Sequence, residues 1–201
     1  MPLLNDAVER LRESLEGTGF EDQSVTLARA PDAARCQYNR GVCIQATFGG
    51  KTGHVTTDAP VEGTTRVSFL FGAALAAPRQ RTAAIAVLNA VSGFLMLARR
   101  LSACREECHA PCLARLRDEL AGSPLYAVGR VEALDRDLAV QLVPDPARAD
   151  VLLVGADGLL SDAGLRVLGE HREQKRILYL GPSTAGLSAL LSAEHWCPYG
   201  R

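Results

Sequence analysis

The chain has 201 residues, 47% of them hydrophobic, with 22 basic and 23 acidic side chains and a net charge of −1. This length suits one large or two small domains that bury a real core. The balanced charge gives no electrostatic basis for binding nucleic acid or an anionic membrane, so we expect neither partner. The start of the chain does not resemble a secretory signal, and Pro78 and Arg79 interrupt its most apolar region. We therefore expect a cytoplasmic protein without a membrane span.

The first half of the chain predicts a small α+β unit. Apolar residues at helical spacing predict an amphipathic helix over residues 3–15. Alternating apolar and polar residues, separated by glycine turns, predict an antiparallel meander. An alanine-rich stretch then predicts a long buried helix. The expected strands are 24–30, 42–48, 53–57 and 65–71, and the long helix is 80–101.

The second half predicts a parallel sheet. The apolar runs 151–154 and 177–180 do not alternate, and each is followed by glycine and then a helix, over 161–169 and 185–193. That order is typical of strands covered on both faces. Residues 138–143 are a further strand candidate. The expected fold class is α/β, with an N-terminal α+β lobe (antiparallel meander plus helices, residues 1–122) followed by a Rossmann-like parallel-sheet lobe (residues 123–201).

Three cysteines lie within nine residues at Cys104, Cys108 and Cys112. On one straight helix, Cys104 and Cys112 would be about 12 Å apart along the axis, which is too far for both thiolates to bind the same metal ion. Pro111 favours a break near His109 and Ala110, followed by a helix over 111–120, and this break would let the third thiol turn back. Cys197 supplies a fourth thiol near the end of the chain. Four thiolates fit a [4Fe–4S] cluster, or zinc or another transition metal.

Other interpretations of the cysteines stay open. They can be small buried apolar residues, or a redox dithiol, because the spacing matches neither common zinc sites nor ferredoxins. Cys36 and Cys43 are interpreted as structural, with Cys36 or Cys43 near the site as the less favoured alternative. His109 and His195 each stand close to a cysteine and are candidate ligands or hydrogen-bond donors to the thiolates.

Two glycine turns follow the apolar strands and predict a ligand crevice. Parallel sheets bind ligands beyond the carboxyl ends of their strands, and free amides at a helix start accept anions. Alternatively, the serine and threonine residues of these turns only cap the helices that follow. Dinucleotide, phosphate-loop and nucleophile-elbow motifs are absent from these turns. The candidate ligand-binding residues are Gly155, Asp157, Gly181, Ser183 and Thr184.

Four stretches resemble a known family. ADVLLVGADGLLSD at 149–162 and ILYLGPSTAG at 177–186 resemble the Rossmann-like heavy-metal-chelation proteins, a group of uncharacterised bacterial and archaeal proteins. GVCIQATFGG at 41–50 and AAIAVLNA at 83–90 resemble the first domain of that family, which is similar to the N-terminal domain of enolase. The resemblance implies two lobes with a cleft, and a role in metal handling or anaerobic cofactor metabolism. It implies no catalytic residues and does not cover the cysteine stretch.

Two functional hypotheses follow. In the first, the chain is a metal-binding protein that holds an iron–sulfur cluster or transition metal through Cys104, Cys108, Cys112 and Cys197. In the second, the glycine turns bind a small anionic metabolite, as an enzyme or a sensor, and the cysteines only pack. The sequence does not decide whether a reaction is catalysed. A third interpretation is an interaction scaffold that forms a homodimer, which rests only on how common homodimers are.

Overall fold

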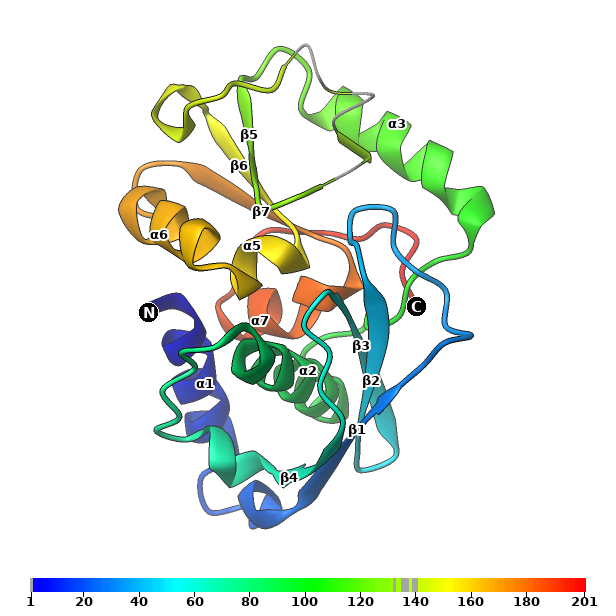
Figure 1. Cartoon of the computed structure of the whole chain (residues 1–201), viewed down its shortest axis with the longest axis vertical. Coiled ribbons are helices and arrows are strands. Elements are labelled where there is room, and N and C mark those ends of the chain that lie inside the picture. Colours follow the sequence, from blue (N-terminus) through cyan, green and yellow to red (C-terminus); the bar gives the residue numbers. More distant parts are fainter. Residues whose placement is uncertain (1, 132, 135–137, 139–140) are drawn as a thin grey trace.

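The structure is a computed structural model that describes residues 2–131, 133–134, 138 and 141–201. It contains one four-stranded antiparallel sheet and a separate four-stranded parallel sheet, with helices packed against both (Figure 1). The predicted two-lobe α/β fold is therefore confirmed. The boundary between residues 122 and 123 stays a prediction.

The antiparallel sheet has the strand order β3-β2-β1-β4. Gly49 and Gly50 both have positive φ and form the tight turn that joins β2 to β3. The expected strand at 65–71 is wrong in its second half, because residues from Val67 onward form a 3-10 helix. The strand that remains pairs with β1 at the far edge of the sheet. The bounds are β1 Ser24–Arg29, β2 Val42–Phe48, β3 Lys51–Thr57 and β4 Gly63–Arg66.

Helix α2 (Pro78–Phe94) lies in the middle of the molecule, where it packs against β2 and β3 on one side and against helix α7 (Ala185–Leu190) on the other. Residues 84–93 are all buried, as expected of a helix between two layers. The helix ends seven residues before its predicted end, because Met96 adopts a left-handed φ of 59°. The amides of Leu97 and Ala98 then both donate to the carbonyl of Ser92. No helix in the described part of the chain is long and apolar enough to cross a membrane.

The parallel sheet has the order β5-β6-β7-β8, and every residue of β6 is buried. The sequence patterns do not predict strands β5 and β8 or the short helix α5, since four, two and five residues are too short for a periodic pattern. Residues 138–143 lie partly outside the described residues, and within them Leu142 forms an isolated parallel bridge with Leu125. The strand bounds are β5 Leu125–Val128, β6 Val151–Val154, β7 Arg176–Leu180 and β8 His195–Trp196.

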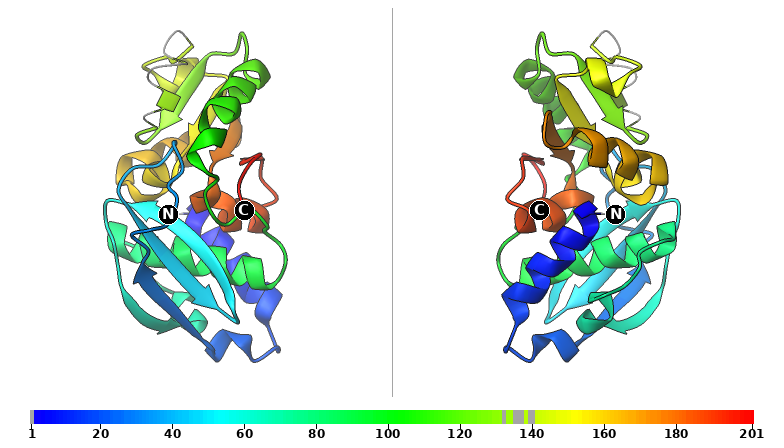
Figure 2. Two further views of the ribbon diagram at one scale, coloured as in Figure 1. Left: turned by 90° about the vertical axis from the view of Figure 1, so that its right-hand side faces the viewer. Right: turned by 90° about the vertical axis from the view of Figure 1, so that its left-hand side faces the viewer.

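The remaining helices cover this sheet and the first lobe. Helix α3 begins two residues before its predicted start, directly after a 3-10 turn. Ser161 caps α6, because its hydroxyl oxygen accepts a hydrogen bond from the amide of Gly164 at 3.1 Å. Their bounds are α1 Pro2–Leu15, α3 His109–Glu119, α5 Ala156–Leu160 and α6 Asp162–His171. The 3-10 helices are η1 Phe20–Asp22, η2 Val67–Leu70, η3 Glu106–Cys108, η4 Pro146–Arg148 and η5 Pro182–Thr184. Helices α1, α2 and α7 pack against one another, as the blue, green and orange ribbons of Figure 2 show.

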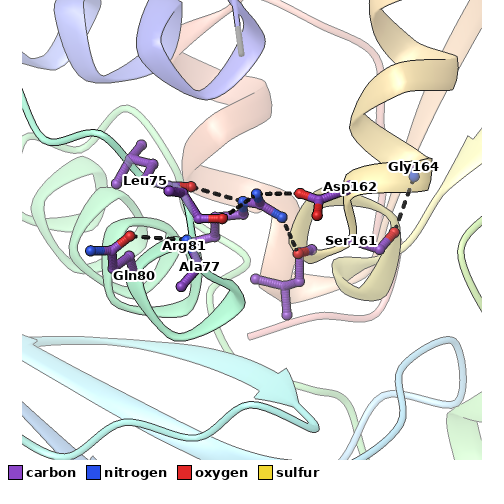
Figure 3. A network of polar contacts seen from close by, with 9 residues as sticks. Leu75, Ala77, Gln80, Arg81, Ser161, Asp162 and Gly164 are labelled. Atoms are coloured by element: carbon purple, nitrogen blue, oxygen red, sulfur yellow. Dashed lines mark hydrogen bonds and ion pairs between the residues drawn. The ribbon is translucent and has the colours of Figure 1, made fainter.

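A buried arginine joins the two lobes. Arg81 in α2 is only 1% exposed and donates to the carbonyls of Leu75 and Leu160 at 2.9 and 2.7 Å. Its guanidinium also pairs with the exposed carboxylate of Asp162 at the start of α6 (Figure 3). Because α2 belongs to the first lobe and α5 and α6 to the second, this side chain holds the lobes in one relative position.

Candidate functional site

Four buried thiols come together from four separate segments of the chain. Cys36 lies in the loop between β1 and β2, Cys104 precedes η3, Cys112 lies in the first turn of α3, and Cys197 follows β8. Each is between 5% and 8% exposed, and none forms a disulfide. The negative charge of any one thiolate would act on the others, since Cys36 interacts electrostatically with all three and Cys197 with Cys104 and Cys112.

These surroundings favour neutral thiols. Burial raises the pKa of Cys36 and Cys104, and raises that of Cys197 to about 12, with repulsion from the neighbouring thiolates adding to the effect. Arg201 opposes this shift at Cys104, and Arg100 opposes it at Cys197. Thiolates in this cluster therefore need a positive charge among them, of the kind that a metal ion supplies.

Two glycines leave room for the sulfur atoms. A Cβ at Gly181 would lie 2.8 Å from the Cys36 sulfur, and a Cβ at Gly200 would lie 2.4 Å from the Cys197 sulfur. Both distances are shorter than carbon and sulfur tolerate without moving. Any larger residue at these positions would displace a thiol, so both glycines belong to the packing of the cluster.

Tyr38 lies against the same thiols. Its hydroxyl is 3.2 Å from Sγ of Cys112, and burial raises the pKa of Tyr38 far above its usual range. The Trp196 side chain also faces Tyr38. Two further polar atoms in this region, Nε2 of His109 and Nε1 of Trp196, are buried and have no hydrogen-bond partner of good geometry among the described residues.

The other two cysteines are placed differently. Cys108, predicted as a ligand, is half-buried at the end of η3 and interacts electrostatically with Cys104. Cys43 is buried on β2, where burial raises its pKa and the positive charge of Arg35 opposes that shift. Among the described residues, no three or more His, Cys, Asp or Glu side chains already have the arrangement that holds a metal ion.

The glycine turns of the second lobe are covered by the loop that carries Cys36. The side-chain oxygen of Asn39 accepts a hydrogen bond from the Ala156 amide at 3.1 Å, directly after Gly155. That amide opens α5 and is the group that an anionic ligand would contact in the predicted crevice. Asp157 is half-buried and accepts from the Arg130 amide at 2.8 Å.

The second glycine turn, at residues 181–184, also forms hydrogen bonds with residues of the first lobe. Ser183 is fully buried, and its hydroxyl oxygen accepts from the Thr56 amide at 3.0 Å and from Asn39 at 3.2 Å. Thr184 is also fully buried and donates to carbonyls of its own turn. The predicted binding role of these turns is not tested by these contacts, but ligand access would require residues 36–39 to move.

Sequence reasoning missed the contribution of the loop between β1 and β2. Cys36 was interpreted as structural by preference, and Tyr38 and Asn39 were not singled out. The only local signal is that Cys36, Tyr38 and Asn39 fall within four residues, between Pro31 and Gly41. Such a loop can reach many surfaces, so its place against β6 and β7 depends on tertiary packing.

Solved structures share this fold at low sequence identity. No family model matches the sequence, and no curated protein matches it. A DUF364 family protein of unknown function from Pyrococcus horikoshii superposes with a TM-score of 0.53 and 16% identity, over 94% of this chain and 82% of that one. A second DUF364 family protein of unknown function, from Desulfitobacterium hafniense, superposes with a TM-score of 0.52 and 18% sequence identity, over 96% of this chain and 83% of that one. The chain therefore has the fold of DUF364 proteins, and at this identity the likeness extends to the fold alone.

Proposed function

We propose that this chain is a metal-binding protein that holds a [4Fe–4S] cluster, or else zinc or another transition metal, through thiolates of Cys36, Cys104, Cys112 and Cys197. The set differs from the one inferred from sequence in having Cys36 in place of Cys108. The observation that carries the proposal is the convergence of four buried thiols from four segments of the chain.

The chemistry of the donors suits such a centre. Thiolate ligands select zinc and iron–sulfur clusters over hard cations. Metal binding removes the thiol protons, and the bound charge compensates for the burial that otherwise disfavours thiolates here. Cys108, beside Cys104 and half-exposed, is the alternative fourth ligand. The resemblance to heavy-metal-chelation proteins, with an enolase-like first domain, agrees with a role in metal handling or anaerobic cofactor metabolism.

The test is the metal content of protein purified without oxygen. We expect iron and sulfide with a visible absorption band, or zinc alone, and uptake of metal on anaerobic reconstitution. Replacing Cys36, Cys112 or Cys197 by serine should abolish or sharply lower the bound metal. A protein that contains no metal and takes up neither iron and sulfide nor zinc would overturn the proposal.

Two further variants separate specific from general effects. Cys43→Ser is the matched control, because Cys43 is also buried but lies outside the cluster. It should leave the metal content unchanged. Cys108→Ser decides the fourth ligand: metal retained in Cys108→Ser and lost in Cys36→Ser supports the set from the structure, and the reverse result supports the set from sequence.

A further inference from the structure

Two adjoining hollows flank the segment 97–102 that follows α2. The larger, about 530 Å³, lies between this segment and the β2–β3 turn and is lined by Lys51, Arg99 and Arg201 among others. The smaller, about 310 Å³, lies between the same segment and α7 and is lined by Arg99, Arg100 and His195 among others. Ala98 and Arg99 line both. The two hollows thus meet at Arg99 and together have the size of a small-molecule site.

The charge of these hollows is one-sided. Their lining residues include four cationic side chains and no aspartate or glutamate. Some arginines elsewhere in the described part of the chain pair with carboxylates, as Arg29 does with Glu62 and Arg172 with Asp6. Within the described residues, none of Lys51, Arg99, Arg100 and Arg201 forms an ion pair. On a chain with a net charge of −1, this is a local excess of cationic over acidic side chains.

The backbone around these cations is held in place. The amide of Ser102 donates to the Arg201 carbonyl at 2.6 Å, and the Arg201 amide donates back to the Ser102 carbonyl at 2.9 Å. The Leu101 carbonyl accepts from the His54 amide of β3 at 2.9 Å. The segment is therefore fixed to both the first sheet and the C-terminal residues. Cations on an anchored backbone lose less freedom when they bind a ligand than cations on a free loop.

We propose that these joined hollows bind a small polyanion, a metabolite with two or more phosphate or carboxylate charges. Lys51, Arg99 and Arg201 contact it in the larger hollow, and Arg100 extends the site into the smaller one. The planar guanidinium of arginine can donate two parallel hydrogen bonds to a phosphate or carboxylate group, and no aspartate or glutamate side chain lines the hollows to compete for it. This site is separate from the glycine turns, and it adjoins the thiol cluster through Arg100 and Arg201, which act electrostatically on Cys197 and Cys104.

The test is calorimetric titration with inorganic pyrophosphate and, separately, with citrate, near neutral pH and at about physiological salt (~0.15 M). Saturable binding of either anion supports the site, and the stronger of the two identifies phosphate or carboxylate as the preferred group. Arg99→Gln should weaken binding by about tenfold or more, as should the pair Lys51→Gln and Arg201→Gln. Arg99→Lys should retain part of the affinity.

The matched control is Arg166→Gln, which removes an exposed cation of α6 outside both hollows. It should leave the affinity unchanged. Thermal unfolding of each variant without anion verifies that the fold is intact. The proposal is overturned if neither anion binds saturably at this salt concentration, or if Arg166→Gln weakens binding as much as Arg99→Gln.

Discussion

The hydroxyl of Tyr38 lies 3.2 Å from Sγ of Cys112, although 74 residues separate them in the sequence. This contact brings the loop between β1 and β2 against the first turn of α3. The same loop carries Cys36 into the thiol cluster and places Asn39 on the amide that opens α5. One loop of the first lobe thus determines the surroundings of both candidate sites.

Replacing Tyr38 by phenylalanine tests this contact. The change removes one buried hydroxyl and keeps the ring, so the free energy of unfolding should fall by about 1 kcal/mol. Chemical denaturation measures it. Tyr126→Phe is the control, since Tyr126 is half-buried on β5 and should lose less. Equal losses in the two variants would show that the Tyr38 hydroxyl contributes nothing specific.

Arg81→Met should be among the most destabilising single changes. It leaves the carbonyls of Leu75 and Leu160 without their buried donor, and we expect a loss of about 3 kcal/mol or more in the free energy of unfolding. Arg81→Lys should not restore stability, because an ammonium cannot reach all of the acceptors in the geometry of the guanidinium.

The control for Arg81 is its partner. Asp162 is 77% exposed, so Asp162→Asn should cost about 1 kcal/mol or less. Denaturation of both variants gives the comparison. A larger loss in Asp162→Asn than in Arg81→Met would contradict the view that the carbonyl contacts, and not the ion pair, hold the lobes.

Two helical glycines should respond in opposite directions to replacement by alanine. A Cβ at Gly186 would lie 2.6 Å from the Leu88 carbonyl oxygen and 2.7 Å from Cα of Asn89, so Gly186→Ala must separate α7 from α2. A Cβ at Gly169 meets nothing within 4 Å, so Gly169→Ala should stabilise helix α6 by about 0.5–1 kcal/mol. Melting temperatures of the two variants should therefore move apart.

Thiol labelling should distinguish Cys108 from the other cysteines. It is half-buried while the other five are buried. In the native, reduced protein, an aromatic disulfide reagent should modify Cys108 rapidly and the remaining thiols at the rate of local opening. Cys108→Ser should remove the rapid phase. A rapid phase that survives this substitution would mean that another thiol is readily accessible.

Stability should decrease at acidic pH. Burial lowers the pKa of His195, with nearby Arg100 acting in the same direction. The unfolded chain, whose histidines titrate near about 6.5, therefore binds a proton more readily than the folded protein does. The free energy of unfolding should decrease as pH falls below about 6.5 and level off once pH is below the folded pKa. Denaturation at several pH values should show a smaller decrease in His195→Gln.

Burial of His54 also lowers its pKa and accounts for part of the remaining slope. A combined His54→Gln and His195→Gln variant should therefore depend on pH less than either single variant. An unchanged slope in the combined variant would show that neither imidazole is responsible for the acid dependence.

Local patterns were sufficient for most of the secondary structure. Alternation identified β1 and β2, the apolar runs identified β6 and β7, and helical spacing identified α1. The sequence patterns miss the short elements β5, α5 and β8, and two further errors lie where a local pattern continues past the element that it predicts. Helix α2 ends at Phe94 because Met96 takes a left-handed conformation, and the strand β4 stops at Arg66 where η2 begins.

By itself, the sequence determined the α/β class, the order of a meander followed by a parallel sheet, and the presence of six cysteines for chemistry. Only the tertiary structure decided which thiols meet and where the cations gather. Cys36, which is distant in sequence, lies with Cys104, Cys112 and Cys197, and Lys51 lies with Arg99 and Arg201. The physical reason is that periodicity reports which face of an element is buried, whereas contacts between loops depend on how complete layers pack against each other.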